Sequence, residues 1–229
     1  MGEDSPQTGS RASRRRWWVG GVLVLVVAVG VASYRWPGRG ILTYFGIELP
    51  SPFNWGEPSA HKLLWPRFDV WGLANFAKIS PDLYRGAQPG REGFVQLQKM
   101  GVRTIVNLRE FHNDRKLMAG LGLRYVQLPF NPTEPEDELI AKFLKVVGDP
   151  ANQPVFVHCQ AGADRTGTMV VMYRVVEQGW PVAEAVKELP HFGFHMVWTD
   201  LTRYLAETHV QALRARVAQE PPVAVEVIP

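Results

Sequence analysis

The single cysteine of this chain stands in a ten-residue stretch, HCQAGADRTG at 158–167, whose side chains suit phosphate chemistry. Cys159 offers a thiol, and Arg165 offers a planar guanidinium that matches two phosphate oxygens. The small residues between them let successive backbone N–H groups turn toward a bound anion. A sulfur surrounded by such positive groups is favoured as the thiolate, which is its nucleophilic form. The spacing therefore predicts a cysteine nucleophile that faces a bound phosphate.

The flanking apolar runs, PVFVHC and TGTMVVMYRVV, indicate a buried strand before this stretch and a helix after it. A strand–loop–helix turn of this kind lies at the carboxyl edge of a parallel sheet, where open α/β folds bind ligands. The helix is expected to begin near Thr166 and to point the positive end of its dipole at the loop. The expected phosphate-binding residues are Gln160, Ala161, Gly162, Ala163, Asp164 and Arg165.

Beyond residue 76, short β-rich runs alternate with helical patterns, which indicates an α/β domain over residues 77–217. A central, mainly parallel sheet flanked by helices is the expected architecture. The clearest helix covers residues 134–147, and its start is marked by the capping-box spacing of Thr133 and Glu136. Residues 218–229 are expected to form a loose tail. The other expected helices cover 93–99, 168–178, 182–189 and 198–217, and the expected strands cover 83–85, 102–108, 123–128 and 155–157.

The N-terminal region predicts a membrane anchor. Residues 17–34 are apolar and uncharged, and they follow a basic tail at 1–16. As a helix this segment would be about 27 Å long, close to the hydrocarbon thickness of a bilayer. A cleaved signal peptide and a buried soluble helix are the alternatives. The arginine cluster favours a cytoplasmic N-terminus, with the domain on the exoplasmic or periplasmic side. Residues 35–76, rich in proline, glycine and aromatic residues, are then a juxtamembrane connector.

The charge distribution argues against a nucleic-acid-binding protein. The net charge is +3, but residues 1–40 alone carry six arginines against two acidic residues, which leaves −1 for the rest of the chain. A nucleic-acid-binding domain would spread basic residues over its folded part. His158 and Cys159 have no second Cys or His pair at ligand spacing, so no metal is expected and no cofactor is needed. The lone cysteine excludes an internal disulfide and is compatible with an oxidising compartment.

The Cys-x5-Arg arrangement, with His158 before it and Thr166 after it, resembles the signature of the cysteine-dependent protein tyrosine and dual-specificity phosphatases. The stretches LYRGAQP, GVRTIVNLR and LPF extend the resemblance over most of residues 77–190, especially to compact bacterial members and the atypical plant and fungal group. The resemblance implies that Cys159 forms a phosphocysteine, that Arg165 binds phosphate in the ground and transition states, and that Thr166 assists hydrolysis of the intermediate. His158 would help to set the loop and the ionisation of the cysteine.

The sequence departs from the family pattern at the general acid. Most relatives use an aspartate on a separate loop, and here the stretch LPFNPTEPED has Asn131 and Pro132 at the expected place. The candidates that follow are also explained by the preference of acidic residues for a helix N-terminus. These candidates are Glu134, Glu136 and Asp137.

Asp164 is a second candidate acid, because an Asp-Arg pair at this point resembles the loop of myotubularin-like phosphatases. Alternatively, Asp164 orients Arg165 by an ion pair or caps the helix. Arg109 ends the strand TIVNLR and would contact substrate or hold a neighbouring loop, and Arg85 has the same two interpretations.

Three functions remain open on the sequence. The first is a membrane-anchored phosphomonoesterase acting on phosphotyrosine proteins, phosphoinositides or inositol phosphates. Phosphotyrosine stands first because QAGAD lacks the lysines that often flank phosphoinositide sites. The second is a catalytically inactive, membrane-tethered phosphate-binding or scaffold domain, against which the intact Cys159, Arg165 and Thr166 argue. A sulfurtransferase is disfavoured, since its loop would not need Arg-Thr at this spacing.

Overall fold

The structure is a computed structural model, and it describes residues 58–229. The predicted basic tail, the predicted anchor at 17–34 and most of the predicted connector lie outside these residues. Within residues 58–229, every helix is too short or too polar to cross a bilayer.

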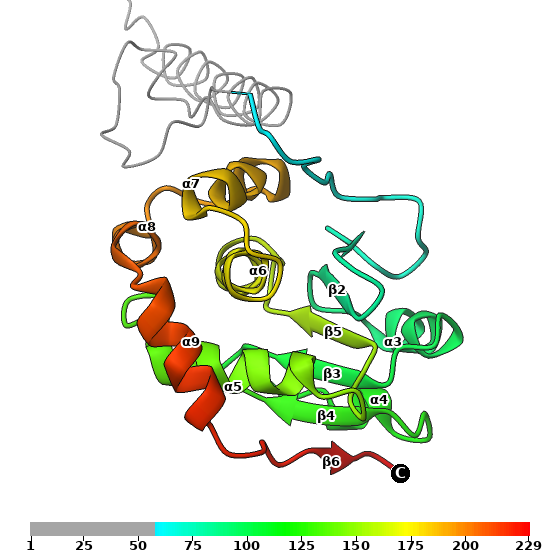
Figure 1. Cartoon of the computed structure of the whole chain (residues 1–229). Helices are drawn as coiled ribbons and strands as arrows, with labels where there is room; N and C mark the ends of the chain where they lie inside the picture. The colour runs from blue at the N-terminus through cyan, green and yellow to red at the C-terminus, as the bar shows by residue number, and fades with distance from the viewer. Residues whose placement is uncertain (1–57) are drawn as a thin grey trace, which may run out of the picture. The chain divides into compact units, whose positions relative to one another are not determined.

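A mixed sheet forms the centre of the described domain, with the strand order β1-β2-β5-β3-β4-β6 (Figure 1). The four inner strands run parallel, which confirms the predicted mainly parallel sheet, and the two edge strands are antiparallel to their neighbours. His158, at the end of β5, is paired with Gly86 on one side and Asn107 on the other. The strands are β1 (Ala77–Lys78), β2 (Leu83–Gly86), β3 (Thr104–Asn107), β4 (Arg124–Gln127), β5 (Val155–His158) and β6 (Glu226–Val227).

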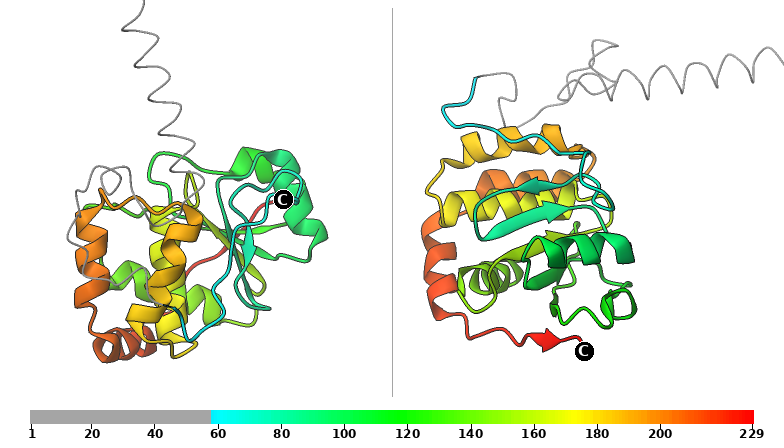
Figure 2. Two further views of the ribbon diagram at one scale, coloured as in Figure 1. Left: turned by 90° about the horizontal axis from the view of Figure 1, so that it is seen from above. Right: turned by 90° about the vertical axis from the view of Figure 1, so that its right-hand side faces the viewer.

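Helices cover both faces of this sheet (Figures 1 and 2). Alternate strand residues point to opposite faces, so Val106 and Val157 join one buried cluster while Ile105 and Phe156 join the other. The first cluster contains α5 (Asp137–Gly148), α6 (Asp164–Val176), α7 (Val182–Ala185), the 3₁₀ helix η1 (Val186–Phe192), α8 (Thr199–Glu207) and α9 (Val210–Gln219). The second contains α3 (Arg91–Lys99) and α4 (Arg115–Met118).

Several predicted helices have other bounds in the structure, and the cause is clearest for α5. The capping box fails because Asn131 accepts hydrogen bonds from the backbone N–H and hydroxyl of Thr133, so a turn forms there and α5 starts at Asp137. Helix α6 begins at Asp164, which places Arg165 inside its first turn. The expected helix at 198–217 is two helices, α8 and α9.

The C-terminal tail was expected to be loose, and this expectation was wrong. Its residues Glu226 and Val227 form β6, which pairs antiparallel with β4. The side chain of Ile228 is buried in the cluster beneath α3 and α4, and the carbonyl of Pro229 accepts a hydrogen bond from the N–H of Gly120. Figure 2 shows this segment crossing to the far edge of the sheet.

Residues 58–66, here called the strap, lie on α7 and η1. The side chain of Glu184 accepts a hydrogen bond from the hydroxyl of Ser59, and that of Glu188 accepts one from the N–H of Leu64. Trp65 stacks on the ring of His191 with their centroids 3.7 Å apart. The end of the predicted connector therefore packs against the folded domain.

Candidate active site

Cys159 lies directly after β5 and is buried, with 3% of its surface exposed. The ends of β2 and β3 flank it, as expected for the carboxyl edge of a parallel sheet. The chain then turns sharply into α6. Residues 159–165, from the cysteine to the arginine, are called the phosphate loop. The structure thus places the predicted nucleophile between strand and helix.

Gly162 makes this turn possible. Its φ of +70° lies in the left-handed region, which favours glycine. A Cβ at this position would stand 2.4 Å from the backbone carbon and oxygen of Gly86, closer than any side chain tolerates. The absence of a side chain therefore lets the phosphate loop pack directly on the end of β2.

The backbone N–H groups of the phosphate loop are available to an anion. Within residues 58–229, no carbonyl or side chain accepts a hydrogen bond from the N–H groups of residues 160–163. The neighbouring carbonyls, in contrast, are held by other groups: that of Gln160 accepts from the N–H of Gln88 at 3.0 Å. Unpaired, adjacent N–H groups at a helix N-terminus form an anion-binding nest.

Arg85 supports the loop from inside the protein. It is fully buried, and its Nη2 donates to the carbonyl of Gly162 at 2.5 Å, while its guanidinium carbon lies 3.8 Å from the ring centroid of Phe192. Burial lowers the pKa of Arg85 to about 10, so it stays a cation at neutral pH. The sequence left open whether Arg85 contacts substrate or holds a neighbouring loop. The structure shows that it holds the loop.

Arg165 and Thr166 lie in the first turn of α6, into which the phosphate loop leads directly. The Nη1 of Arg165 is 3.4 Å from the carbonyl oxygen of Leu108, and its side chain is only half-buried, so it can also reach a ligand. The hydroxyl of Thr166 is buried, and in the described part of the chain it has no hydrogen-bond partner. This hydroxyl is therefore available to donate to a group that enters the site.

His158 belongs to a buried polar network that the sequence analysis missed. Its Nε2 lies 3.0 Å from Oδ2 of Asp114, and its Nδ1 lies 3.1 Å from the carbonyl oxygen of Cys159. Each ring nitrogen faces an oxygen, so the two contacts fix the orientation of the ring. The Asp114 carboxylate also accepts hydrogen bonds from Asn107 and Gln88. These contacts hold the His158 ring and the carbonyl of Cys159 in place at the end of β5.

Asp164 is held at the rim of the site by the segment after η1. Its Oδ1 accepts a hydrogen bond from the N–H of His195 at 2.7 Å, and both carboxylate oxygens lie 3.1 Å from Nδ1 of the same residue. Asp164 is only partly exposed, whereas the side chain of His195 is 61% exposed. A carboxylate and an imidazole thus meet directly beside Arg165.

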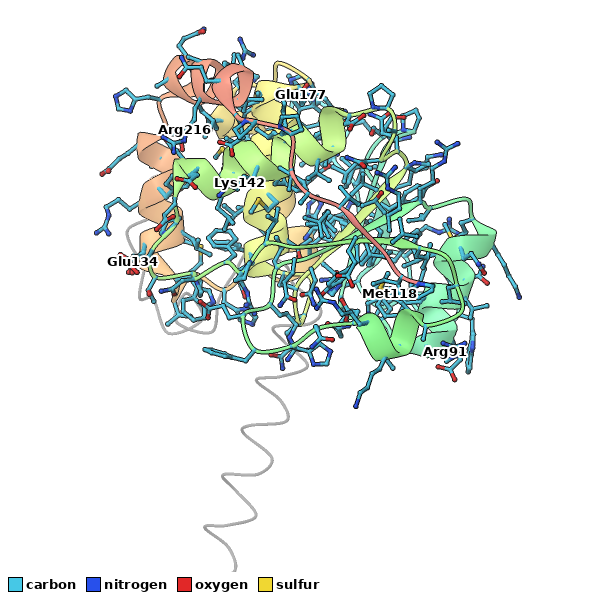
Figure 3. The ribbon with its side chains drawn as sticks, turned by 90° about the horizontal axis from the view of Figure 1, so that it is seen from below. Arg91, Met118, Glu134, Lys142, Glu177 and Arg216 are labelled. Carbon is cyan, nitrogen blue, oxygen red and sulfur yellow. The ribbon has the colours of Figure 1, made fainter. Side chains whose placement is uncertain are left out.

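The other candidate acids have different surroundings. Asp137 accepts a hydrogen bond from the hydroxyl of Tyr204 on α8, and burial together with this carboxylate raises the pKa of Tyr204. Glu134 is exposed and points away from the ribbon at the periphery of the molecule (Figure 3). Glu136 is likewise exposed, at the N-cap of α5. Only Asp164 is part of the phosphate loop itself.

Arg109 borders the site. Its backbone N–H donates to the side chain of Asn107, and its Nη1 lies 3.5 Å from Oε1 of Gln88, which also contacts the phosphate loop. The side chain is half-exposed, so the structure supports both a loop-holding contact and access to a ligand. Among the described residues, no group of three His, Cys, Asp or Glu side chains is arranged to hold a metal ion.

A buried cysteine, an N–H nest and an arginine at the carboxyl edge of the sheet define a cysteine-dependent phosphatase. Comparison with known proteins agrees. The model of the family described as "DSP-PTPase phosphatase fused to NAD+ Kinase" matches residues 74–199. The chain belongs to this family of phosphatases and is an enzyme of the protein tyrosine and dual-specificity type.

Individual relatives are similar over most of the described domain. The "Dual specificity protein phosphatase TpbA" of Pseudomonas aeruginosa (strain UCBPP-PA14) is 31% identical over 178 residues, which cover 74% of this chain and 79% of the relative. The crystal structure of P. aeruginosa TpbA is 30% identical with a TM-score of 0.58, covering 66% of this chain and 98% of that one. The "Inositol diphosphatase SIW14" of Saccharomyces cerevisiae is 31% identical over 131 residues, 52% of this chain and 46% of the relative.

Proposed function

We propose that this phosphatase hydrolyses phosphomonoesters through a cysteinyl-phosphate intermediate. The observation that carries the proposal is the position of Cys159 below a nest of unpaired N–H groups, with Arg165 beside it. The sulfur attacks phosphorus, the bond from phosphorus to the ester oxygen breaks, and that oxygen takes up a proton. Water then attacks the phosphocysteine, which releases inorganic phosphate and regenerates the thiolate.

The side chains around the cysteine would share the remaining work. Arg165 would bind two phosphate oxygens as the charge redistributes, and the N–H groups would bind the others. The unpaired hydroxyl of Thr166 would donate to the thiolate as it leaves in the second step. Asp164, oriented by His195, would give the leaving oxygen its proton, because it is the acidic side chain of the phosphate loop.

Phosphotyrosine in proteins is the substrate we place first. One solved structure of TpbA, 29% identical to this chain, is a complex with pTyr. Relatives named inositol diphosphatases support inositol phosphates as the second class. The phosphate loop contains no lysine, whereas phosphoinositide sites are often flanked by several.

Two assays test this proposal. The full chain should hydrolyse p-nitrophenyl phosphate, and Cys159→Ser should abolish hydrolysis; activity retained by that variant would refute the proposed chemistry. A panel of phosphotyrosine peptides, phosphoinositides and inositol polyphosphates should give the highest kcat/KM on the peptides. A preference for the polyphosphates would overturn the order of substrates while leaving the chemistry intact.

We also propose that residues 17–34 anchor the enzyme in a membrane, with the catalytic domain on the exoplasmic or periplasmic side. The support is the apolar stretch and the arginine cluster before it. In sealed cells, external protease should degrade the domain. Degradation only after the cytoplasmic side is opened would contradict this topology.

A further inference from the structure

Asn75 lies outside the phosphate loop in sequence but contacts it in space. Its Nδ2 donates to the carbonyl of Ala161 and to the carbonyl of Phe192, each at 3.0 Å. One side-chain amide therefore links the middle of the phosphate loop to the end of η1. Both hydrogens of this NH2 group are used, so the contact has a defined geometry.

The backbone of Asn75 adopts the left-handed conformation, which is uncommon for residues other than glycine and easiest among them for asparagine. Its φ is +51°, and it is the only residue other than glycine with a positive φ in the described part of the chain. Such residues persist where the surrounding structure fixes them, and they cluster at functional sites. Here the carbonyl of Ala74 accepts from the N–H of Ala87, and the side chain of Phe76 is buried. Contacts on both sides thus hold the residue in this conformation.

The contact completes a series of four along the phosphate loop. Four consecutive carbonyls, those of residues 159–162, have hydrogen-bond partners outside the loop. In a trans peptide the C=O and the following N–H point in opposite directions. Holding these carbonyls away from the cysteine therefore turns the N–H groups of residues 160–163 toward the anion site. The partners, in order, are Nδ1 of His158, the N–H of Gln88, Nδ2 of Asn75 and Nη2 of Arg85.

The peptide between Ala161 and Gly162 depends most on such a contact. Glycine accepts both signs of φ, so this peptide can flip at little steric cost. A flip would replace the inward N–H of Gly162 with a carbonyl oxygen, which repels phosphate. We infer that Asn75 is a positioning residue that prevents this flip and keeps the phosphate loop in its anion-binding form. This inference rests on the proposed binding of phosphate by the loop.

Two substitutions test the role of Asn75 in the full chain. Asn75→Gly removes the donor and relieves the backbone conformation, and Asn75→Asp places an oxygen opposite two carbonyl oxygens. Each should weaken competitive inhibition by inorganic phosphate at least tenfold during p-nitrophenyl phosphate hydrolysis. The melting temperature of Asn75→Gly should fall only modestly: water can satisfy the exposed carbonyl of Ala161, whereas the part-buried carbonyl of Phe192 loses its donor.

Asn152 supplies a matched control. Its Nδ2 also donates to a carbonyl, that of Val146, but it lies at the other end of β5. Asn152→Asp should lower the melting temperature and leave phosphate inhibition within twofold of the parent. Phosphate inhibition of Asn75→Gly within twofold of the parent would overturn the inference, and so would a loss of inhibition matched by loss of folded protein. A parent chain that phosphate does not inhibit would instead refute the proposed function.

Discussion

At the scale of single residues, the proposed general acid is Asp164, at the start of α6. The carboxylate lies next to Arg165, and the segment after η1 holds it through a backbone N–H and an imidazole. Among the described contacts, the carboxylate makes neither an ion pair with Arg165 nor a helix cap, because it bonds to His195 instead.

Asp164→Asn should affect substrates according to their leaving groups. General acid catalysis is worth roughly 10²- to 10⁴-fold, so kcat on phenyl phosphate should fall by about that factor. p-Nitrophenyl phosphate, whose leaving group needs no proton, should be spared. The variant should also lose the fall in kcat at high pH, because that limb reports an acid that must be protonated.

The control for this experiment is Asp137→Asn, which alters a carboxylate bound to Tyr204. It should leave both the leaving-group dependence and the pH profile unchanged. Equal losses on the two substrates in Asp164→Asn would contradict its role as the acid.

A second prediction concerns the close packing of Gly162, and Gly179 serves as the control position. The two have nearly equal φ values, +70° and +72°, but only at Gly162 would a Cβ collide with backbone. Gly179→Ala should cost about 1 kcal/mol of stability and leave activity intact. Gly162→Ala should displace the phosphate loop and lower kcat/KM by about 100-fold. Similar kinetics for the two variants would show that close packing on Gly86 is not needed.

At the scale of elements, sequence periodicity was enough to predict the four inner strands and most helices. Alternating or continuous apolar runs predict a strand, and apolar residues that recur about every 3.6 positions predict a helix. The phosphate loop was predictable because its chemistry is concentrated in ten consecutive residues. These features depend only on neighbours in sequence.

The features that sequence reasoning missed depend on distant residues. Asp114 reaches His158 across 44 positions, and Asn75 reaches Ala161 across 86. Nothing in the residues around Asp114 or Asn75 marks them, because both look like ordinary turn residues. Strand β6 was missed for the same reason: it is short, and it forms only because the edge of β4 is open to it.

The C-terminal strand can be tested with two adjacent residues. Ile228 is 4% exposed, whereas Val227 is 62% exposed on the same short segment. Ile228→Ala should lower the free energy of unfolding by about 2 kcal/mol, the lower end of the range for a buried isoleucine. Val227→Ala should change it by less than about 0.5 kcal/mol. Denaturant titration measures both, and equal effects would mean that the tail is not part of the folded domain.

At the scale of the whole molecule, the strap joins the segment that follows the predicted anchor to the catalytic domain. Glu184 holds it through the hydroxyl of Ser59 and the N–H of Ala60, and it also pairs with Lys187. Next to it, the buried ion pair of Glu188 and Arg174 holds η1 on α6. Through these contacts the strap lies against the helices that support the phosphate loop.

The contacts of Glu184 predict a dependence of stability on pH. Hydrogen bonds from Lys187, Ser59 and Ala60 lower the pKa of Glu184 from 4.5 to about 2. Its charged form is favoured in the folded state, so it stabilises the protein above pH 4.5, and this contribution is lost as pH falls toward 2. The difference in melting temperature between the parent and Glu184→Gln should therefore be largest near neutral pH and vanish near pH 2.

Glu110, an exposed loop residue, provides the control for this titration. The melting temperature of Glu110→Gln should stay close to that of the parent at every pH. A Glu184→Gln difference that persists unchanged to pH 2 would show that the carboxylate charge does not hold the strap.

The central claim is that the sulfur of Cys159 accepts the phosphoryl group, and mass spectrometry of rapidly quenched turnover tests it most directly. The peptide that contains Cys159 should carry one phosphoryl group during turnover on p-nitrophenyl phosphate, and Cys159→Ser should show neither turnover nor this adduct. An unmodified peptide in the active parent, together with continued hydrolysis by Cys159→Ser, would contradict the account.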